Sequence, residues 1–389
     1  MFEWFQKFFE KKTKSVLGVD LGSSTIKIVE VSESAAGKKL ETYGLASFST
    51  DGSLPGALAS FMEEAAPGNG LEGPMGNNNQ DGSLTIENLS NRQIGQIIKE
   101  LASQAKVKTR TAYFSIPTYA TFSTVVSLPL ESSEEIAAAI PYEAKKYIPV
   151  PMEDVLLDWV VFKKNLPEPT KGSISEAETK ASEATEGLGG QMQTSGQPPE
   201  TEPEGSGGKK QKATSVFLVA ILKEVVEKYT EIAQIANLNA RIMEAENFCL
   251  ARAFAFSAGR RVIIIDAGDK YIDLTLVEDG MIKITHNVAG AIEEKSKEII
   301  EKNLAAEIEK VLALNKRNFS DAEPVEGKII FVLAGGRAFS QNLTFLKDRF
   351  NAEMAVGNPF SGMEYQKALE PALAELGPSL AVAAGMAMR

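Results

Sequence analysis

The stretch that decides the fold is VLGVDLGSSTIKIVEV, residues 16–31. A short apolar run leads to Asp20, and a second run, which alternates β-branched with polar residues, contains Lys27. Between the runs lies a turn with one glycine and two hydroxyls, Gly22, Ser23 and Ser24. The pattern predicts a strand, a tight turn and a strand. Many such segments are ordinary hairpins, but backbone amides, hydroxyls, an ammonium and a carboxylate also suit a polyphosphate with its Mg²⁺.

The pattern recurs in VIIIDAGDKYIDLTLV, residues 262–277. An offset of 246 (266 − 20) superposes Asp20 on Asp266 and Gly22 on Gly268. Each copy continues into a third strand-like run, at Lys38–Phe48 and Met281–Val288. Internal repeats outweigh local signals. The repeat predicts two similar α/β domains whose acidic turns face each other across a nucleotide cleft.

The two turns resemble the phosphate motifs of the actin-like ATPase superfamily, which includes actin, heat-shock chaperones, sugar kinases and FtsA. A third element, IIFVLAGG at 329–336, resembles the superfamily's adenosine motif and precedes a helix expected from about Ser340 to Phe350. The resemblance implies an α/β fold of two ribonuclease-H-like domains around a nucleotide cleft. An inserted α+β subdomain is expected in the first domain.

Within this superfamily the chain is similar to the PilM family of type IV pilus assembly. The similarity includes YIPVPMEDVLLDW at 147–159, the segment Val216–Phe254 and the closing PSLAVAAGMAMR. It implies an ATP-binding scaffold that binds the N-terminal cytoplasmic tail of PilN in a groove between the first domain and the insert. Tyr142–Asp154 is a candidate for part of that groove. Through PilN and PilO the scaffold would couple the pilus motor ATPases to the inner-membrane complex.

The expected domain boundaries follow from these matches. They are an N-terminal arm at 1–14, a first actin-like domain at 15–117 and 223–260 with a C-terminal helix at 379–389, an inserted subdomain at 118–222, and a second actin-like domain at 261–378. Within the insert, 165–212 is rich in Glu, Ser, Thr, Gly and Pro and reads as a disordered linker, because it has too few apolar residues to offset ordering entropy.

Periodicity predicts further helices and strands. The expected helices are 90–105, 132–147, 223–236, 248–256, 292–314 and 379–388, and the expected strands are 111–116, 122–128, 155–162 and 215–222.

Composition excludes several classes of function. A net charge of −11 argues against nucleic acid as the main partner. The single cysteine, Cys249, excludes an intramolecular disulfide, and the single histidine, His286, excludes a multi-histidine metal site. No apolar run has the length of a membrane span, so we expect a cytoplasmic protein, and the resemblance to the PilM family implies a position peripheral to the inner membrane. Residues 1–14, MFEWFQKFFEKKTK, suit either membrane contact or an arm that docks on the first domain.

The resemblance assigns site residues to ATP and Mg²⁺. Asp20 and Asp266 would hold Mg²⁺, largely through water, and Glu307 would approach the ribose and adenine. Further nucleotide contacts are expected from both turns and from the paired glycines: Gly22, Ser23, Ser24, Lys27, Gly268, Asp269, Gly335 and Gly336. The second turn departs from the family pattern, with Asp269 and the bulky Tyr271 where relatives carry small residues and hydroxyls. Asp269 would repel phosphate or add a metal ligand, and Lys270 would compensate; the sequence leaves both open.

No water-activating residue is identified, so the sequence predicts ATP binding but not ATP hydrolysis. Three alternatives differ in class. An FtsA-like polymerising protein tethered to membrane would favour an amphipathic helix after the fold, but the chain stops at Arg389. A component of the related type II secretion platform shares the fold. A sugar or acetate kinase would need a substrate pocket with a catalytic base.

Overall fold

The computed structural model describes residues 15–35, 37–48, 86–130, 132–162, 214–254, 259–289, 297–319, 327–336 and 343–389. The expected arm at 1–14 and linker at 165–212 lie outside these residues, as does most of the segment around 49–85. The chain divides into two compact units, and the smaller one is Tyr119–Val225. The remaining chain, up to Thr118 and from Val226 onward, forms the larger unit.

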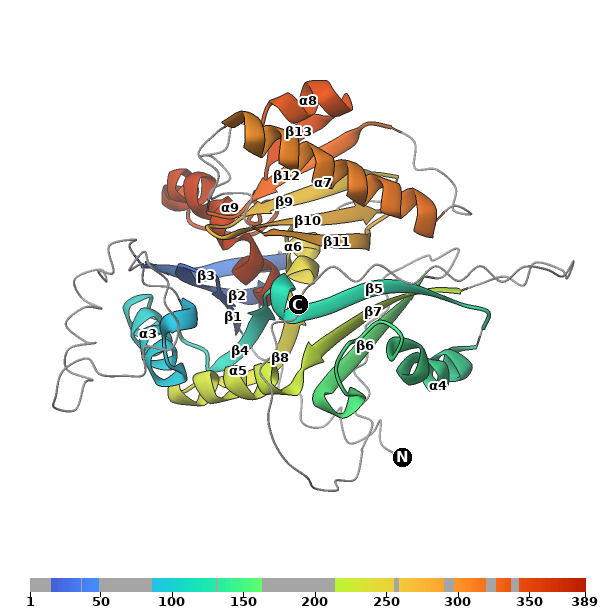
Figure 1. Cartoon of the computed structure of the whole chain (residues 1–389). Coiled ribbons are helices and arrows are strands. Elements are labelled where there is room, and N and C mark those ends of the chain that lie inside the picture. The colour runs from blue at the N-terminus through green and yellow to red at the C-terminus, as the bar shows by residue number, and fades with distance from the viewer. Residues whose placement is uncertain are drawn as a thin grey trace, which may run out of the picture. The chain divides into compact units, whose positions relative to one another are not determined.

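The larger unit contains two sheets, each with five strands among the described residues (Figure 1). The first sheet has the order β3-β2-β1-β4-β8. Its strands are β1 (Ser15–Leu21), β2 (Thr25–Ser34), β3 (Gly37–Ser47), β4 (Thr111–Ile116) and β8 (Asn239–Ala245). The first three are antiparallel neighbours, whereas β4 runs parallel to both β1 and β8.

The second sheet repeats this topology with the order β11-β10-β9-β12-β13. Its strands are β9 (Arg261–Ala267), β10 (Tyr271–Glu278), β11 (Met281–Ala289), β12 (Ile329–Ala334) and β13 (Glu353–Val356). Again three antiparallel strands are followed by parallel ones. The repeat predicted from the Asp-x-Gly turns is therefore confirmed at the level of sheet topology.

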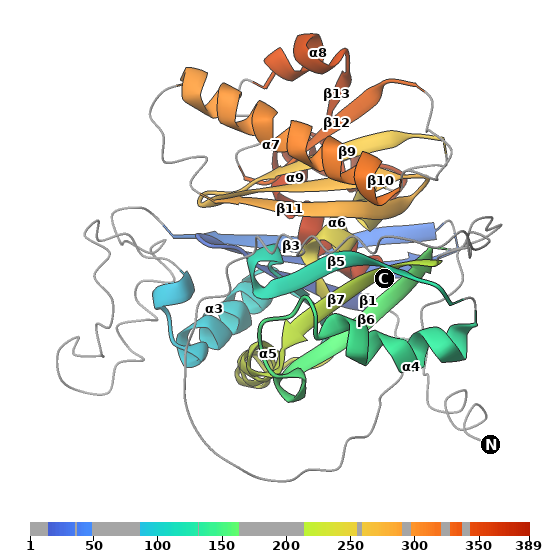
Figure 2. The same ribbon diagram turned by 45° about the vertical axis from the view of Figure 1, so that its right-hand side comes forward.

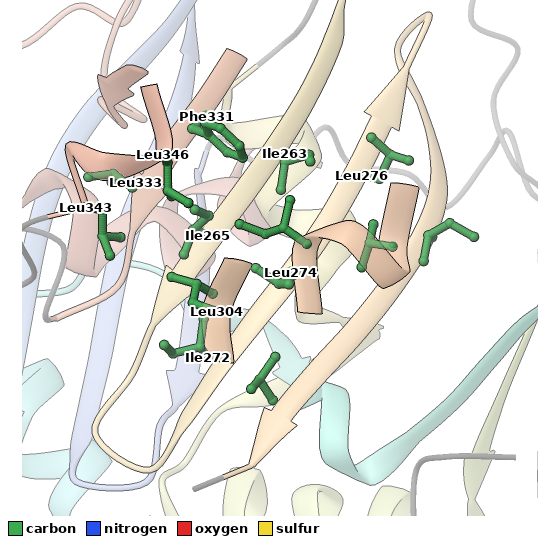
Figure 3. Packing of buried hydrophobic residues seen from close by; sticks show 14 residues of the cluster. Ile263, Ile265, Ile272, Leu274, Leu276, Leu304, Phe331, Leu333, Leu343 and Leu346 are labelled. Carbon is green, nitrogen blue, oxygen red and sulfur yellow. The ribbon is translucent and has the colours of Figure 1, made fainter. Parts of the chain in front are cut away.

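The strands form because their apolar residues are buried. The side chains of Val262–Ile265 on β9 are fully buried, as expected for a central strand. One face of the second sheet packs against α7 (Lys297–Asn318), which Figure 2 shows running across that sheet. Figure 3 shows this core from close by, with Leu304 of α7 beside Ile272 and Leu274 of β10. α8 (Phe345–Phe350) adds Leu346 to the same core.

Helices of the larger unit connect and cover the sheets. They are η1 (Ile86–Asn88), α3 (Asn91–Gln104), α5 (Lys223–Ile235, which begins in the smaller unit), α6 (Glu246–Phe254), η4 (Lys367–Leu369) and α9 (Glu370–Ala387). Ser90 caps α3 through a capping box with Gln93. The helices expected at 90–105, 223–236 and 248–256 are confirmed to within two residues at each end.

The final helix is longer than the sequence predicted. α9 starts at Glu370, nine residues before the expected start at Ser379. Pro378 lies inside the helix, and prolines usually mark a helix end, so the early start was hidden. α9 lies close enough to β1 that a Cβ on Gly18 would meet the carbonyl of Ala383. It packs as closely on α6, because a Cβ on Gly385 would meet the carbonyl of Cys249.

The smaller unit is a three-stranded antiparallel sheet with the order β5-β7-β6. Its elements are η2 (Thr118–Ala120, which begins in the larger unit), β5 (Thr121–Leu128), α4 (Ser133–Ala144), η3 (Met152–Asp154), β6 (Val155–Phe162) and β7 (Thr214–Leu222). α4 covers one face of the sheet, with Ile136 and Ile140 packed on Val216 and Leu218. This is the strand-helix-strand-strand set expected for the insert.

Two strands were missed, and α8 begins later than expected. β8 and β13 were not predicted; β13 has only four residues, of which three are exposed, so it carries no burial pattern. α7 is described from Lys297, against an expected start at 292, and α8 from Phe345, against about 340. Among the described residues, no helix is long and apolar enough to span a membrane.

Candidate functional site

The two Asp-x-Gly turns have the same backbone arrangement. In the first turn the Gly22 N–H donates to the Thr25 carbonyl at 2.9 Å, and in the second the Gly268 N–H donates to the Tyr271 carbonyl at 3.0 Å. The cross-strand partner of Asp20 is Lys27. The cross-strand partner of Asp266 is Asp273. The repeat therefore places a lysine and an aspartate in equivalent positions.

Asp20 is buried, with 3% of its surface exposed, and both of its oxygens are bonded. Lys27 Nζ lies 2.9 Å from Oδ2, and Ser115 Oγ on β4 donates to Oδ1 at 2.8 Å. Burial lowers the pKa of Lys27, but the ion pair with Asp20 and the charges of Asp266 and Glu246 raise it more, so its pKa lies above the usual value. The first turn thus holds a carboxylate that is paired with an ammonium and a hydroxyl.

In the described part of the chain, Asp266 has neither a lysine nor a serine in the positions equivalent to those of Lys27 and Ser115. Ala334, which pairs with Asp266 in the parallel ladder, stands where the first sheet has Ser115 next to Asp20. Burial raises the pKa of Asp266 to about 6, with Lys27 lowering it and Asp20 raising it. Burial also raises the pKa of Asp273 to about 7, although its Oδ1 accepts a 2.8 Å hydrogen bond from Asn287 Nδ2.

A further carboxylate, Glu246 at the start of α6, belongs to this group. Its Oε1 accepts a 2.6 Å hydrogen bond from the Thr118 N–H. Burial, followed by the charges of Asp273, Asp266 and Asp20, raises the pKa of Glu246 well above its usual value. The site therefore gathers four carboxylates and one ammonium, so ionisation of all four carboxylates would leave an excess of negative charge. A bound divalent cation would relieve this imbalance and favour the ionised carboxylates.

The two turns also contact each other directly. Ser24 Oγ of the first turn donates to Asp269 Oδ2 of the second. Lys270 Nζ lies 2.8 Å from Glu87 Oε2, which belongs to η1 in the first half of the chain. Both groups that the sequence left unassigned in the second turn are thus engaged with the first half of the molecule.

The paired glycines, Gly335 and Gly336, differ in how closely other atoms surround them. Gly335 has φ +88°, and a Cβ there would meet the Ala267 carbonyl and Asp266 Oδ1. Its N–H donates to the Pro378 carbonyl of α9 at 2.8 Å. Gly336 is exposed, and a Cβ there would meet nothing within 4 Å. Gly335 is required by the fold, whereas Gly336 leaves open space beside the second turn.

Glu307, expected to approach the nucleoside, is engaged within the second half. Its Oε2 lies 2.7 Å from His286 Nε2, and its Oε1 lies 2.7 Å from Lys310 Nζ. Burial raises the pKa of Glu307, but hydrogen bonds from Lys310 and His286 lower it more, so its pKa lies below the usual value. No contact between Glu307 and the turns is recorded among the described residues.

Sequence reasoning missed three members of the site. Ser115 and Glu246 come from segments far from either turn, and no local pattern marks them. Asp273 carried a usable signal, because the offset of 246 superposes it on Lys27. In the described parts of the chain, no three or more His, Cys, Asp or Glu side chains gather in a geometry that holds a metal.

Comparison with solved structures identifies the fold. The structure of a PilM–PilN type IV pilus biogenesis complex matches with a TM-score of 0.62 at 18% identity, covering 96% of this chain and 98% of that one. The chain therefore has the two-domain actin-like fold of PilM. No protein-family model matches the chain.

Two further solved structures match with TM-scores below 0.5. MreB5 of Spiroplasma citri bound to AMPPNP matches with a TM-score of 0.39 at 10% identity, covering 96% of this chain and 95% of that one. The cytoplasmic domain of EpsL, an inner-membrane component of the Vibrio cholerae type II secretion system, matches with a TM-score of 0.38 at 8% identity, covering 82% and 81%. The fold assignment rests on the PilM structure alone.

Proposed function

We propose that the paired turns bind ATP with Mg²⁺. Asp20 and Asp266 would hold the ion, largely through water, and the amides and hydroxyls of Gly22, Ser23 and Ser24 would bind phosphate oxygens. In the second turn Gly268 and Asp269 would line the phosphates, and Gly335 and Gly336 would flank the nucleoside. Lys27 would contact phosphate by exchanging its bond to Asp20 for one to the ligand.

The observation that carries this proposal is the contact between two turns that share one backbone arrangement and that each follow a buried or half-buried aspartate. Such a turn on its own is an ordinary hairpin, but here Asp20, Lys27 and Asp266 interact electrostatically. Burial raises the pKa of several carboxyl groups at this site, which means that their charged forms are destabilised there. Such a cluster is unfavourable if its role is only structural. A metal ion that binds between the turns would supply the missing positive charge.

We further propose that the chain is a scaffold of type IV pilus assembly. The fold shared with PilM supports this role, and the solved relative is a complex with PilN. The N-terminal cytoplasmic tail of PilN would be the direct partner, and PilO and the motor ATPases would be coupled through the assembly. The protein would then lie in the cytoplasm at the inner membrane, and its role would extend to twitching motility.

Tyr142 supports a peptide site on α4. Its side chain is 73% exposed, which is unusual for a large aromatic residue, and Lys145 Nζ lies 6.0 Å from its ring centre. An exposed aromatic ring beside a cation is typical of residues that contribute strongly to protein interfaces.

Calorimetric titration tests both parts of the proposal. Mg·ATP would be titrated into wild type, Asp20→Asn and the control Asp348→Asn, which removes an exposed carboxylate of α8. We expect binding to wild type and the control, and a loss of tenfold or more in Asp20→Asn. A synthetic N-terminal PilN peptide from the same genome would be titrated into wild type and Tyr142→Ala. Absence of ATP binding by folded wild type would refute the nucleotide site, and absence of peptide binding would refute the pilus role.

A further inference from the structure

The outer edge of the small sheet has features of a strand-binding site. β6 pairs with β7 on one side, and among the described residues no strand pairs with its other side (Figures 1 and 2). An edge strand presents alternate N–H and C=O groups that can pair with another extended segment. This edge lies in the smaller unit, whereas the residues assigned to ATP belong to the larger unit.

The backbone of β6 shows which groups point outward. The Trp159 N–H donates to Oδ1 of Asp158, the side chain of the preceding residue, at 2.9 Å. This N–H is therefore directed away from β7, and by the alternation of the ladder so are those of Leu157 and Val161. Asp158 thus occupies the position that the carbonyl of an added strand would take.

The side chains of β6 alternate between two faces. Val155, Leu157, Trp159 and Val161 pack toward the core under α4. The opposite face carries Leu156 and Val160, each 48% exposed, with the exposed Asp158 between them. Natural proteins commonly use charged side chains to keep edge strands from pairing with other chains. Two exposed apolar side chains on one edge strand are therefore uncommon.

We infer that β6 binds an extended peptide segment of a partner protein by strand addition, with apolar residues flanking a central lysine or arginine. The peptide carbonyl would accept the Trp159 N–H, which releases the Asp158 carboxylate to pair with the basic side chain. Apolar residues two positions before and after the basic one would cover Leu156 and Val160, because cross-strand neighbours on one face repeat every second residue. The motif is apolar-x-basic-x-apolar.

The charge of Asp158 also favours a basic peptide over a second copy of this chain. A second copy of β6 would bring Asp158 of one chain toward Asp158 of the other, and like charges across a strand pair are unfavourable. A basic extended segment meets the opposite charge instead. The inference does not depend on the nucleotide site or on PilN.

Two labelled peptides test the proposal by fluorescence anisotropy with the full chain: SVTKTVS and its acidic counterpart SVTETVS. We expect wild type to prefer the lysine peptide by tenfold or more, and Asp158→Lys to reverse the preference. The matched control Glu134→Lys makes the same change in net charge at the exposed start of α4, and it should keep the wild-type preference. Equal binding of both peptides to wild type, or a reversal in Glu134→Lys as well, would overturn the proposal.

Backbone methylation separates strand addition from simple charge attraction. Two versions of SVTKTVS would carry N-methyl groups, one on the valine and lysine amides and the other on the threonine amides. Strand pairing requires that one version lose binding and the other keep it, because only alternate amides face β6. Equal binding by both versions would refute strand addition.

Sedimentation velocity of Asp158→Ser tests the remaining occupant. We expect this variant to sediment as wild type does. Self-association of Asp158→Ser, combined with no peptide preference in wild type, would overturn the proposal. It would show that Asp158 only prevents β6 from pairing with other copies of the chain.

Discussion

The two Asp-x-Gly turns share one backbone geometry but differ in what surrounds the first aspartate. In the first turn Asp20 has an ammonium and a hydroxyl as partners, Lys27 and Ser115. In the second turn the equivalent positions are Asp273 and Ala334. The first turn is nearly neutral without a ligand, whereas the second carries uncompensated carboxylates. The carboxylate of the first turn is thus paired within the protein, whereas the second turn offers its carboxylates no such partner among the described residues.

Removal of each aspartate should give the largest difference in stability between the two turns. Asp20→Ala leaves Lys27, 9% exposed, without its nearest partner, so we expect a loss of about 3–5 kcal/mol in unfolding free energy. Asp266→Ala removes a carboxylate that burial disfavours, so its effect should stay within about 1 kcal/mol or be stabilising. Urea unfolding without nucleotide measures both. Equal destabilisation by the two substitutions would contradict the asymmetry.

The glycine pair gives the next largest expected effect. Gly335→Ala forces a side chain into a left-handed backbone conformation and against the Ala267 carbonyl, so we expect a loss of about 2–4 kcal/mol. Gly336→Ala should change stability by less than about 0.5 kcal/mol, because nothing lies near its Cβ. If Gly336 flanks the nucleoside, that variant should instead bind Mg·ATP more weakly. Similar unfolding free energies for the two variants would refute this division of roles.

The pKa values of the second turn predict a pH dependence. The pKa of Asp273 is raised to about 7 and that of Asp266 to about 6, so the folded protein holds more protons than the unfolded chain between about pH 4 and 7. Their contribution to stability is therefore full at low pH and is lost as the pH rises through 6 and 7. Asp273→Asn removes this loss, so the stabilisation that it gives the nucleotide-free protein should grow between about pH 4 and pH 7, by roughly 1.4 kcal/mol for each pH unit, and then level off. A pH-independent difference between wild type and variant would contradict the assignment.

The contacts between the turns should have the smallest effect. The Ser24–Asp269 hydrogen bond and the Lys270–Glu87 ion pair are at the surface. Exposed pairs contribute about 0–1 kcal/mol, so Glu87→Gln should change the unfolding free energy by less than that. Its effect should appear in nucleotide exchange, since the pair connects the two halves beside the site. Stopped-flow release of a fluorescent ATP analogue measures the exchange rate, with Asp348→Asn as the control. Equal release rates for wild type and Glu87→Gln would contradict a role of the ion pair in exchange.

Much of the fold followed from the sequence because the repeat is a strong signal. Two apolar strands around an Asp-x-Gly turn, at a fixed offset, specify the core of both sheets. The site was only partly accessible, since Ser115 and Glu246 reach it through tertiary packing that no spacing encodes. The final helix was predicted only from Ser379 onward, after Pro378, because a proline is unusual inside a helix. The carbonyl of Pro378 accepts the Gly335 N–H, an interaction that only the folded chain reveals.

The central claim is that both turns contribute to one nucleotide and metal site. The most direct measurement is a crystal structure of the chain with Mn²⁺ and AMP-PNP, using the anomalous signal of manganese to place the ion. We expect one manganese peak between the turns, bridged through water to Asp20 and Asp266, with the phosphates against Gly22–Ser24. Bound nucleotide with manganese elsewhere, or with Asp266 uninvolved, would contradict the claim.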